Sequence, residues 1–185
     1  MRILVAMSGG VDSSVVAALL KEQGHEVIGV TMKSWEGPNG KMPESGCCTA
    51  SDSEDARKVA SKLDIPYYVL DYTESFSKNV VDNFTQMYAQ GLTPNPCVEC
   101  NRSVKFDHFI TQAKKLNCDK VATGHYAKII HKDNRHYLSR AKDITKDQTY
   151  FLHEVSEKEF SKCLFPLENL TKSEVRNIAL KNGLV

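Results

Sequence analysis

The chain has 185 residues, of which 41% are hydrophobic and 25% are charged, as is ordinary for a globular domain with a hydrophobic core. Its formal net charge of +1 gives no argument for binding to nucleic acid or membranes through the bulk field, so any RNA contact has to come from a local patch. No apolar run approaches the roughly 20 residues that a membrane span needs. The start of the chain does not have the layout of a signal peptide, and a cytoplasmic location with no membrane partner is the expectation.

Six cysteines stand at positions 47, 48, 97, 100, 118 and 163. The chain is too large and too rich in core residues to need a disulfide framework. The spacing of the cysteines, with one adjacent pair and one C-x-x-C, favours reduced thiols or metal ligation. We interpret Cys47 and Cys48 as incidental thiols of a loop, and Cys118 and Cys163 as small hydrophobic residues.

Hydrophobic periodicity divides the first part of the chain into alternating strands and helices. Short apolar runs bounded by turn residues predict buried strands, and apolar residues at helical spacing, as at Val11, Val15 and Ala18, predict helices. The expected strands cover residues 3–7, 26–33, 67–70 and 120–123, and the expected helices cover residues 11–23, 51–63, 74–90 and 101–116. This order predicts an α/β fold, a doubly wound parallel sheet with helices on both faces.

Two connections in this part have a character of their own. Residues 34–50 have the length of a functional lid or a disordered segment. Residues 93–97 contain Pro94 and Pro96, which predict a non-helical segment. After the first connection, Ser51-x-x-Glu54 predicts a capping box at the start of the next helix.

The last third of the chain has a different rhythm. Residues 127–130 and 136–139 flank Lys132-Asp133-Asn134 and predict a β-hairpin. Two further capping boxes, Ser156-x-x-Glu159 and Thr171-x-x-Glu174, predict helices near the C-terminus. We therefore expect residues 127–185 to form a small hairpin and a helical extension of the same domain.

The junction between the first strand and the first helix carries the string Ser8-Gly9-Gly10-Val11-Asp12-Ser13-Ser14. Glycines let the backbone approach an anion closely, and the N–H groups at a helix N-terminus point toward it. The hydroxyls of Ser8, Ser13 and Ser14 add donors. The string lacks both the Gly-Lys-Ser/Thr of a Walker A loop and the G-x-G-x-x-G of a Rossmann loop, so it predicts another kind of phosphate loop.

Asp12 is unusual in such a loop, because a carboxylate repels a polyphosphate unless a divalent cation bridges the two. Mg²⁺ coordinated by Asp12 and by phosphate oxygens would turn this repulsion into attraction. The alternative interpretation is that Asp12 caps the helix and that Ser-Gly-Gly is an ordinary turn. The preceding strand, the following helix and the complete string favour phosphate binding.

Five ordered strings resemble a known family. The phosphate loop resembles that of the N-type ATP pyrophosphatases (PP-loop ATPases), which cleave ATP between the α- and β-phosphates and pass AMP to a substrate oxygen. Together with residues 93–106, 122–126, 146–152 and Met32-Lys33, it closely resembles the tRNA-specific 2-thiouridylases. The resemblance implies an adenine nucleotide alpha-hydrolase-like fold, with an ATP-binding catalytic domain over residues 1–185.

The resemblance also implies a reaction and its site residues. ATP would adenylate the C2 oxygen of the wobble uridine of tRNA, and sulfur would then replace that oxygen, delivered as a persulfide by a sulfur-relay protein or a cysteine desulfurase. By position, the ATP contacts are Ala6, Met7, Ser8, Gly9, Gly10, Val11, Asp12, Ser13, Met32 and Gly124. The target base would meet Asn95, Pro96 and Cys97, and the tRNA would meet Lys146, Asp147 and Gln148. The catalytic residues would be Asp12, through Mg²⁺, and Cys100, which aligns with the family's nucleophilic cysteine.

The chain departs from the family pattern near its end. In that pattern a second cysteine, which receives the persulfide, follows the sequence that resembles Lys181-Asn-Gly-Leu-Val185, and tRNA-binding domains come later. We expect these residues to be the catalytic-domain portion of a longer protein. This chain alone is then expected to bind ATP without completing the thiolation.

Sulfur transfer needs an accessible thiolate with a lowered pKa. We expect a helix to begin near Asn101, so that its dipole and the charges of Arg102 and Lys105 would stabilise a thiolate at Cys100. Some family members have Asp at the position of Cys97, which makes Cys97 the alternative thiol. The other interpretation is that Cys97 and Cys100 belong to a zinc site or an iron–sulfur cluster with further ligands from elsewhere.

Three other features have two interpretations each. His125 could contact phosphate or metal, or be a structural histidine, and Trp35 could stack on adenine or pack under a loop. The basic residues after the hairpin could bind RNA or form a solvated face; they are Arg135, Arg140, Lys142 and Lys146. A uridine stacked in an anticodon loop has to be extruded before its base can react. We expect the RNA itself to be recognised by the shape of its loop and by phosphate contacts.

Two other functions remain open from the residues alone. The first is a PP-loop synthetase that adenylates a small metabolite to make an amide or amidine, in which Cys100 has no specific role. The second is a non-catalytic nucleotide- or metal-binding module, which would bind ATP and release no pyrophosphate.

Overall fold

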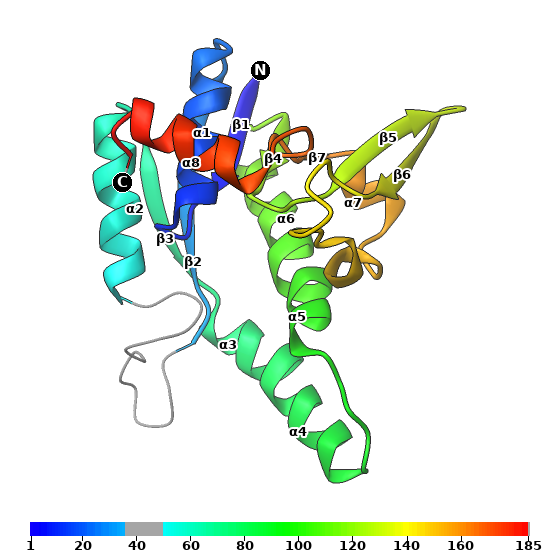
Figure 1. Ribbon diagram of the computed structural model, residues 1–185. Coiled ribbons are helices and arrows are strands. Elements are labelled where there is room, and N and C mark those ends of the chain that lie inside the picture. The colour runs from blue at the N-terminus through cyan, green and yellow to red at the C-terminus, as the bar shows by residue number, and fades with distance from the viewer. Residues whose placement is uncertain (36–49, 185) are drawn as a thin grey trace.

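The computed structural model of the chain describes residues 1–35 and 50–184, and these form a parallel sheet with helices on both sides (Figure 1). The five strands of this sheet are β1 (Arg2–Ala6), β2 (Glu26–Lys33), β3 (Tyr67–Asp71), β4 (Lys120–Ala122) and β7 (Cys163–Leu164). Their order is β3-β2-β1-β4-β7, and every neighbouring pair is parallel. The predicted doubly wound α/β fold is confirmed.

Side-chain alternation along β1 divides the core into two layers. Ile3 and Val5 belong to one cluster of buried residues, and Leu4 belongs to the other, as the two-residue period of a strand requires. The first layer is completed by α1 (Val11–Glu22), α2 (Ala50–Lys62) and α8 (Lys172–Lys181). The second is completed by η2 (Cys100–Phe106), α6 (Asp107–Lys115), η3 (Thr149–Leu152) and α7 (Glu157–Phe160). Strand β1, at whose end the phosphate loop begins, is therefore packed on both faces.

The β-hairpin predicted after β4 is present as a two-stranded antiparallel sheet. It consists of β5 (Lys128–Lys132) and β6 (Arg135–Ser139). Asp133 and Asn134 have φ values of +51° and +57° at its turn. Two successive left-handed residues are what a tight hairpin turn needs, and Asn and Asp tolerate that conformation better than most residues.

Both predicted C-terminal capping boxes are formed. The Ser156 and Thr171 side chains accept from the backbone of Glu159 and Glu174, whose carboxylates bond back to the capping residues. These caps begin α7 and α8. Helix α8 packs on α1, which carries residues of the phosphate loop, so the second box has a direct bearing on the site.

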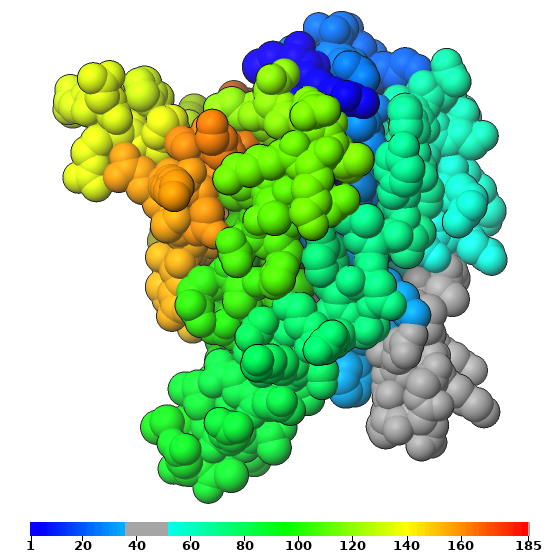
Figure 2. All heavy atoms as spheres, turned by 180° about the vertical axis from the view of Figure 1, so that it is seen from behind, coloured from blue at the N-terminus to red at the C-terminus, as the bar shows by residue number. Residues whose placement is uncertain are grey.

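A helical run and the hairpin both extend away from the sheet. The run consists of α3 (Thr73–Phe76), the π-helical η1 (Ser77–Val81) and α4 (Asp82–Ala89), and it agrees with the predicted helix over residues 74–90. Figure 2 shows the end of this run and the hairpin as two separate projections from the body of the molecule.

The structure corrects the expected environment of two elements. Strand β3 was predicted to be buried, yet Tyr68 and Val69 are 48% and 42% exposed because β3 is an edge strand. Helix α2 begins at Ala50, so Ser51 lies inside the helix and not at its N-cap. Apart from its two ends, the connection predicted at residues 34–50 lies outside the described residues, as do Cys47 and Cys48.

Candidate functional site

The phosphate loop lies where β1 ends and α1 begins. Gly9 has φ +74°, and Gly10 is the N-cap of α1 in an extended conformation, with no side chain that accepts from the helix. The first-turn N–H groups of α1 are therefore not capped by a side chain. They have the arrangement that binds an anion at a helix N-terminus.

Two of the three loop serines use their hydroxyls to shape the loop. Ser13 Oγ accepts from the Ser8 N–H at 3.1 Å and lies 3.1 Å from the Gly10 carbonyl, to which it donates. Ser14 is fully buried and donates to the same carbonyl at 2.9 Å. Ser8 is exposed, so it is the loop serine that is accessible from solvent.

Close contacts explain two of the glycines. A Cβ on Gly124 would lie 3.2 Å from the Ser13 nitrogen and 3.3 Å from the Asp12 Cβ, because Gly124 follows β4 and lies directly against the first turn of α1. A Cβ on Gly9 would collide with the Asp52 carbonyl oxygen. The structure thus brings Gly124 to the phosphate loop, as predicted.

Four further residues predicted to contact ATP turn their side chains into the core. Met7 and Met32 are only 2% and 9% exposed, and their side chains belong to the two core layers. Ala6 and Val11 pack against the same layers. A nucleotide would therefore meet these residues mainly through their backbone. Trp35, the predicted stacking partner of adenine, has its ring 6.3 Å from that of Phe76.

Asp12 is held by two residues from distant parts of the chain. Lys172 Nζ lies 2.6 Å and 2.7 Å from its two carboxylate oxygens, and Tyr126 Oη donates to Oδ1 at 2.9 Å. Burial, followed by the hydrogen bond to Asp12, raises the pKa of Tyr126, so Tyr126 remains a donor at neutral pH. Neither Lys172 nor Tyr126 was expected at this site. The only sequence signal near Lys172 is the capping box that places it in the first turn of α8.

The C-x-x-C motif lies in a helix that begins earlier than expected. Helix α5 (Pro96–Glu99) starts with Pro96 at its first position and with Asn95 as its N-cap, whose side chain accepts from the Cys97 N–H at 3.0 Å. Proline fits the first helical position because the N–H that it lacks would have had no partner within the helix. The expectation that residues 93–97 are wholly non-helical is therefore wrong.

This start changes the helix-dipole argument. Cys97 is exposed and lies in the first turn, whereas Cys100 is half-buried and follows α5 at the beginning of the π-helical η2. The prediction that Cys100 lies at a helix N-terminus is thus wrong, and Cys97 is the thiol that faces the positive end of the dipole. The Arg102 guanidinium, expected to support Cys100, forms an ion pair with Glu99 at 2.8 Å.

Hydrogen bonds connect the C-x-x-C helix with the phosphate loop. Asn101 donates to the Phe151 carbonyl at 3.0 Å, which joins η2 to η3. Gln148, just before η3, exchanges two hydrogen bonds with the backbone of Tyr126, at 2.9 Å and 3.0 Å. Since Tyr126 also bonds to Asp12, four of the five resembling strings are physically joined.

The predicted tRNA contacts divide into exposed and internal residues. Lys146 is exposed and available to a phosphate. Asp147 accepts from the Thr149 hydroxyl at 2.6 Å, and Gln148 is committed to Tyr126. Lys146 is thus the one of the three with an accessible charge, while Asp147 and Gln148 shape the segment.

His125 is a neutral residue in an aromatic environment. Its ring lies 6.0 Å from the rings of both Phe106 and Phe165, and its Nδ1 is 2.8 Å from the Thr123 hydroxyl. Burial, with a smaller contribution from Lys105, lowers the pKa of His125 to about 3. His125 therefore carries no positive charge for a phosphate at neutral pH.

A family comparison adds to this geometry. The family described as the tRNA methyl transferase HUP domain matches residues 1–185. The chain belongs to this family. The HUP domain is 51% identical to a tRNA-specific 2-thiouridylase MnmA from Clostridium perfringens, over 99% of this chain and 51% of the relative. It is 52% identical to one from Symbiobacterium thermophilum, over 100% of this chain and 49% of the relative. The chain thus spans about half the length of the curated relatives it matches.

Solved structures of low sequence identity share the fold. A 4-thiouridine synthetase in complex with RNA and bound ATP has a TM-score of 0.63 at 15% identity, covering 99% of this chain and 41% of that chain. An NMN synthetase from Francisella tularensis has a TM-score of 0.59 at 16% identity, covering 100% of this chain and 62% of that chain. These likenesses support the HUP-type sheet and its helices.

The thiols of this HUP domain do not form a complete metal site within residues 1–35 and 50–184. In that part of the chain, no group of at least three His, Cys, Asp or Glu side chains is placed to hold a metal ion. Cys97 and Cys100 would need ligands from elsewhere. In the same part of the chain, no helix is long and apolar enough to cross a membrane.

Two of the four basic residues expected to form a patch are paired. Arg135 forms an ion pair with Glu157 at 2.9 Å, and Lys142 forms one with Glu174 at 3.0 Å. Arg140 and Lys146 are exposed. The basic patch expected from the sequence is thereby partly neutralised.

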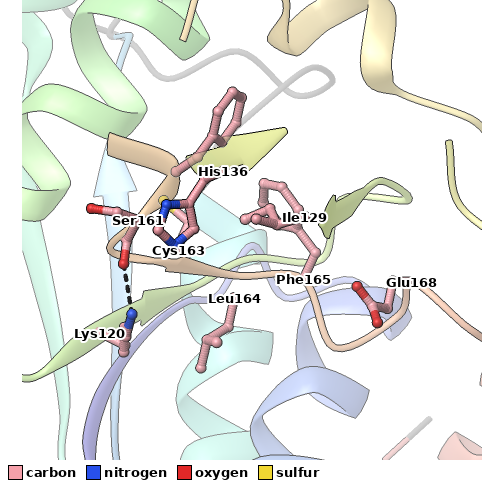
Figure 3. A pocket seen from close by; sticks show the side chains of 9 residues that line it. Lys120, Ile129, His136, Ser161, Cys163, Leu164, Phe165 and Glu168 are labelled. Carbon is pink, nitrogen blue, oxygen red and sulfur yellow. Dashed lines mark hydrogen bonds between the residues drawn. The ribbon is translucent and has the colours of Figure 1, made fainter. Parts of the chain in front are cut away.

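Two cavities of the HUP domain lie apart from the C-x-x-C motif. One, of about 210 Å³, lies between the hairpin and β7; His136, Cys163 and Glu168 line it, and none of the predicted site residues does (Figure 3). Burial raises the pKa of Cys163, as expected for a thiol that acts as a small hydrophobic residue. A second, of about 380 Å³, lies between α2 and the C-terminal segment and reaches the phosphate loop at Gly9.

Proposed function

We propose that this domain uses ATP to adenylate the C2 oxygen of the wobble uridine of tRNA, as the first half of a 2-thiouridylase reaction. The observation that carries the proposal is the connection of the glycine phosphate loop to the C-x-x-C helix through Tyr126, Gln148 and Asn101. The names of the relatives, which are tRNA-specific 2-thiouridylases, supply the substrate class.

The chemistry needs a positioned triphosphate more than a strong catalyst. A uracil carbonyl oxygen is a poor leaving group, whereas an adenylated oxygen can depart with AMP. The uridine oxygen attacks the α-phosphorus, and pyrophosphate leaves with the electron pair of the broken bond. Backbone N–H groups at Gly9, Gly10 and the first turn of α1 would stabilise the charge on the phosphates.

The second step is sulfur transfer. The terminal sulfur of a persulfide, supplied by a sulfur-relay protein or a cysteine desulfurase, attacks C2, and AMP departs with the former oxygen. A thiolate then attacks the inner sulfur of the remaining S–S bond, which releases 2-thiouridine and leaves a disulfide with the donor cysteine. Cys100 is the proposed nucleophilic thiol of this step, and Cys97, which faces the helix N-terminus, is the alternative. Asn95, Pro96 and Cys97 would meet the target base, and Lys146, Asp147 and Gln148 the neighbouring tRNA.

ATP fits the phosphate loop, because the first-turn N–H groups of α1 have no side-chain cap and Gly124, which lies directly against that turn, has no side chain to cover it. Mg²⁺ would be held by Asp12 and the phosphates, and would neutralise the charge that builds up on the leaving pyrophosphate. A zinc ion or iron–sulfur cluster at Cys97 and Cys100 fits less well, since the described residues offer no third ligand.

The domain would be the ATP-binding catalytic part of a longer cytoplasmic protein, with residues 127–185 as its hairpin and helical extension. Later domains would bind the tRNA. A PP-loop synthetase for a small metabolite and a non-catalytic nucleotide-binding module are the two rival functions.

Pyrophosphate release with candidate tRNA anticodon stem-loops tests the proposal, with Cys100→Ser and Cys97→Ser as variants. The expected result is release that depends on a wobble uridine and persists in both variants, while 2-thiouridine formation with a persulfide donor and the complete protein is lost in Cys100→Ser. Thiolation at full rate in Cys100→Ser would contradict the assignment of Cys100 as the nucleophilic thiol, whereas full turnover of a small metabolite by Cys100→Ser would favour the rival synthetase. ATP binding without pyrophosphate release on any RNA would favour the binding module.

A further inference from the structure

We propose that Lys172 is a phosphate-positioning residue. When a divalent cation binds Asp12, the Lys172 ammonium group leaves Asp12 and binds the pyrophosphate portion of ATP. The inference rests on the proposed function and extends it to a residue outside the resembling strings. Its basis is the contact of Lys172 Nζ with both oxygens of the one carboxylate in the phosphate loop, at 2.6 Å and 2.7 Å.

Lys172 occupies a helical position that a lysine normally avoids. It is the first residue of α8, where the positive end of the helix dipole disfavours a cation. The position is fixed from several sides, because Thr171 caps the helix with Glu174 and the Lys172 N–H donates to Asp143 at 2.9 Å. A lysine that is held so firmly against the dipole preference needs an anionic partner, which Asp12 supplies.

The pair lies at the boundary between protein and solvent. The side chains of Lys172 and Asp12 are 24% and 32% exposed, so ions can reach both groups while the surroundings still strengthen their attraction. The ammonium group of Lys172 also lies 6.0 Å from the centre of the Tyr126 ring, within the range of a cation–π contact. Tyr126 therefore contacts both members of the pair.

Metal binding and the ion pair compete for the same oxygens. A Mg²⁺ ion that coordinates Asp12 would stand within a few ångströms of an ammonium group in the present geometry, and the two cations repel each other. Lys172 has a flexible four-carbon stem and three donors, so it can turn to a new anion without moving α8. The phosphates that arrive with the metal provide that anion next to the first turn of α1.

A merely structural ion pair predicts the opposite behaviour. If Lys172 only neutralises Asp12, its removal frees the carboxylate, and the affinity for a metal–nucleotide complex rises or stays the same. If Lys172 contacts the phosphates, its removal weakens binding of every ligand that carries the pyrophosphate group. The sign of the change in affinity thus separates the two roles.

The test is calorimetric titration of the chain with three ligands: the Mg²⁺ complex of α,β-methylene-ATP, Mg²⁺-pyrophosphate, and adenosine. Lys172→Met removes the cation, Lys172→Gln keeps a donor for Asp12 without the charge, and Lys172→Arg keeps the charge. Lys181→Met, at the other end of α8, is the matched control. Circular dichroism and thermal melting show whether each variant is folded.

The expected result for Lys172→Met and Lys172→Gln is a loss of affinity of about tenfold or more for both pyrophosphate-containing ligands, as for a lost charge-assisted hydrogen bond. Adenosine affinity stays unchanged, Lys172→Arg retains most of the phosphate affinity, and Lys181→Met behaves like the wild type. If the wild type binds all three ligands and folded Lys172→Gln binds them equally or more tightly, the inference is overturned while the proposed function stands. If the wild type binds no Mg²⁺–nucleotide, both are overturned.

Discussion

Asn101 donates to the carbonyl of Phe151 at 3.0 Å across 50 residues of sequence, and this bond places the C-x-x-C helix against the segment that begins at Lys146. Asn101 is only 2% exposed, and its Oδ1 atom has no hydrogen-bond partner among the described residues. The adjacent residue is Cys100. Asn101, through the hydrogen bond of its amide nitrogen, therefore helps to set the position of Cys100, the proposed nucleophile.

Replacement of Asn101 by alanine should loosen the segment that carries Cys100. The Phe151 carbonyl would lose its donor, and a buried unsatisfied group of this kind costs about 1–3 kcal/mol. Urea unfolding measures the loss of stability, and alkylation kinetics of Cys100 relative to Cys97 measure the loosening. Asn169→Ala, at an exposed asparagine, is the control. Equal stability and equal Cys100 reactivity in Asn101→Ala would contradict this role for Asn101.

The tight approach of Gly124 predicts a selective effect of one methyl group. In Gly124→Ala the new Cβ would meet the Ser13 nitrogen at 3.2 Å and the Asp12 Cβ at 3.3 Å, so the first turn of α1 has to shift. We expect a loss of stability of about 1–3 kcal/mol, as for other overpacked sites, together with weaker binding of Mg²⁺-ATP. Chemical unfolding and calorimetry provide the two measurements.

Gly10→Ala is the matched comparison, because a Cβ there would have the Ser8 Oγ as its nearest neighbour, at 3.6 Å. Its φ of −78° also suits an alanine. The stability of Gly10→Ala should therefore stay close to that of the wild type. A Gly124→Ala variant as stable as Gly10→Ala would show that the contact at the first turn can relax without cost.

The sequence predicts those parts of the fold that have strong local signals. Strand β2 has the predicted bounds, the turn of the hairpin uses Asp133 and Asn134, and the boxes at Ser156 and Thr171 begin helices. Strand β7 has only two residues and owes its place to pairing with β4, so it leaves no periodic pattern. That β3 is an edge strand is equally invisible, because its residues Tyr67–Asp71 are as apolar as those of a central strand.

The candidate site also has parts that the sequence predicts and parts that it does not. Its phosphate loop and thiols are visible as strings, because backbone geometry and nucleophilic chemistry require particular residues close together in sequence. Lys172 is 160 residues from Asp12, and a single lysine in a helical turn has no signature that names its partner. Two prolines argue against a helix over residues 93–97, yet the second suits a first helical position, so the start of α5 at Pro96 has an ambiguous signal in the sequence.

Asn95 combines a helix cap with a proposed contact to the target base, and substitutions can separate the two. Asn95→Ala removes the acceptor of the Cys97 N–H, which should cost about 1 kcal/mol of stability, whereas Asn95→Ser keeps a capping oxygen. If the amide also contacts the base, Asn95→Ser should retain stability and lose RNA-dependent pyrophosphate release. Thermal unfolding and a pyrophosphate assay report on the two roles. Full release by Asn95→Ser would limit Asn95 to capping.

Acid should weaken the attachment of α8 through Glu174. Hydrogen bonds from the Thr171 backbone, from Lys142 and from the Thr171 hydroxyl lower the pKa of Glu174 from 4.5 to about 2. A carboxylate with a lowered pKa stabilises the folded state above its unfolded value, and this stabilisation is lost as the pH falls from about 4.5 to about 2. The wild type should therefore lose more stability than Glu174→Gln between pH 7 and pH 3.

Denaturant unfolding at several pH values gives the difference between the wild type and Glu174→Gln. Lys142→Met is the intermediate case, because it removes one of the groups that lower the pKa of Glu174 and leaves the Thr171 bonds in place. Since Lys172 is the next residue after Thr171, the same acid range should also weaken the affinity for Mg²⁺-pyrophosphate more in the wild type than in Glu174→Gln. Parallel stability curves for the two proteins from pH 7 to pH 3 would mean that the Glu174 carboxylate does not hold the start of α8 in solution.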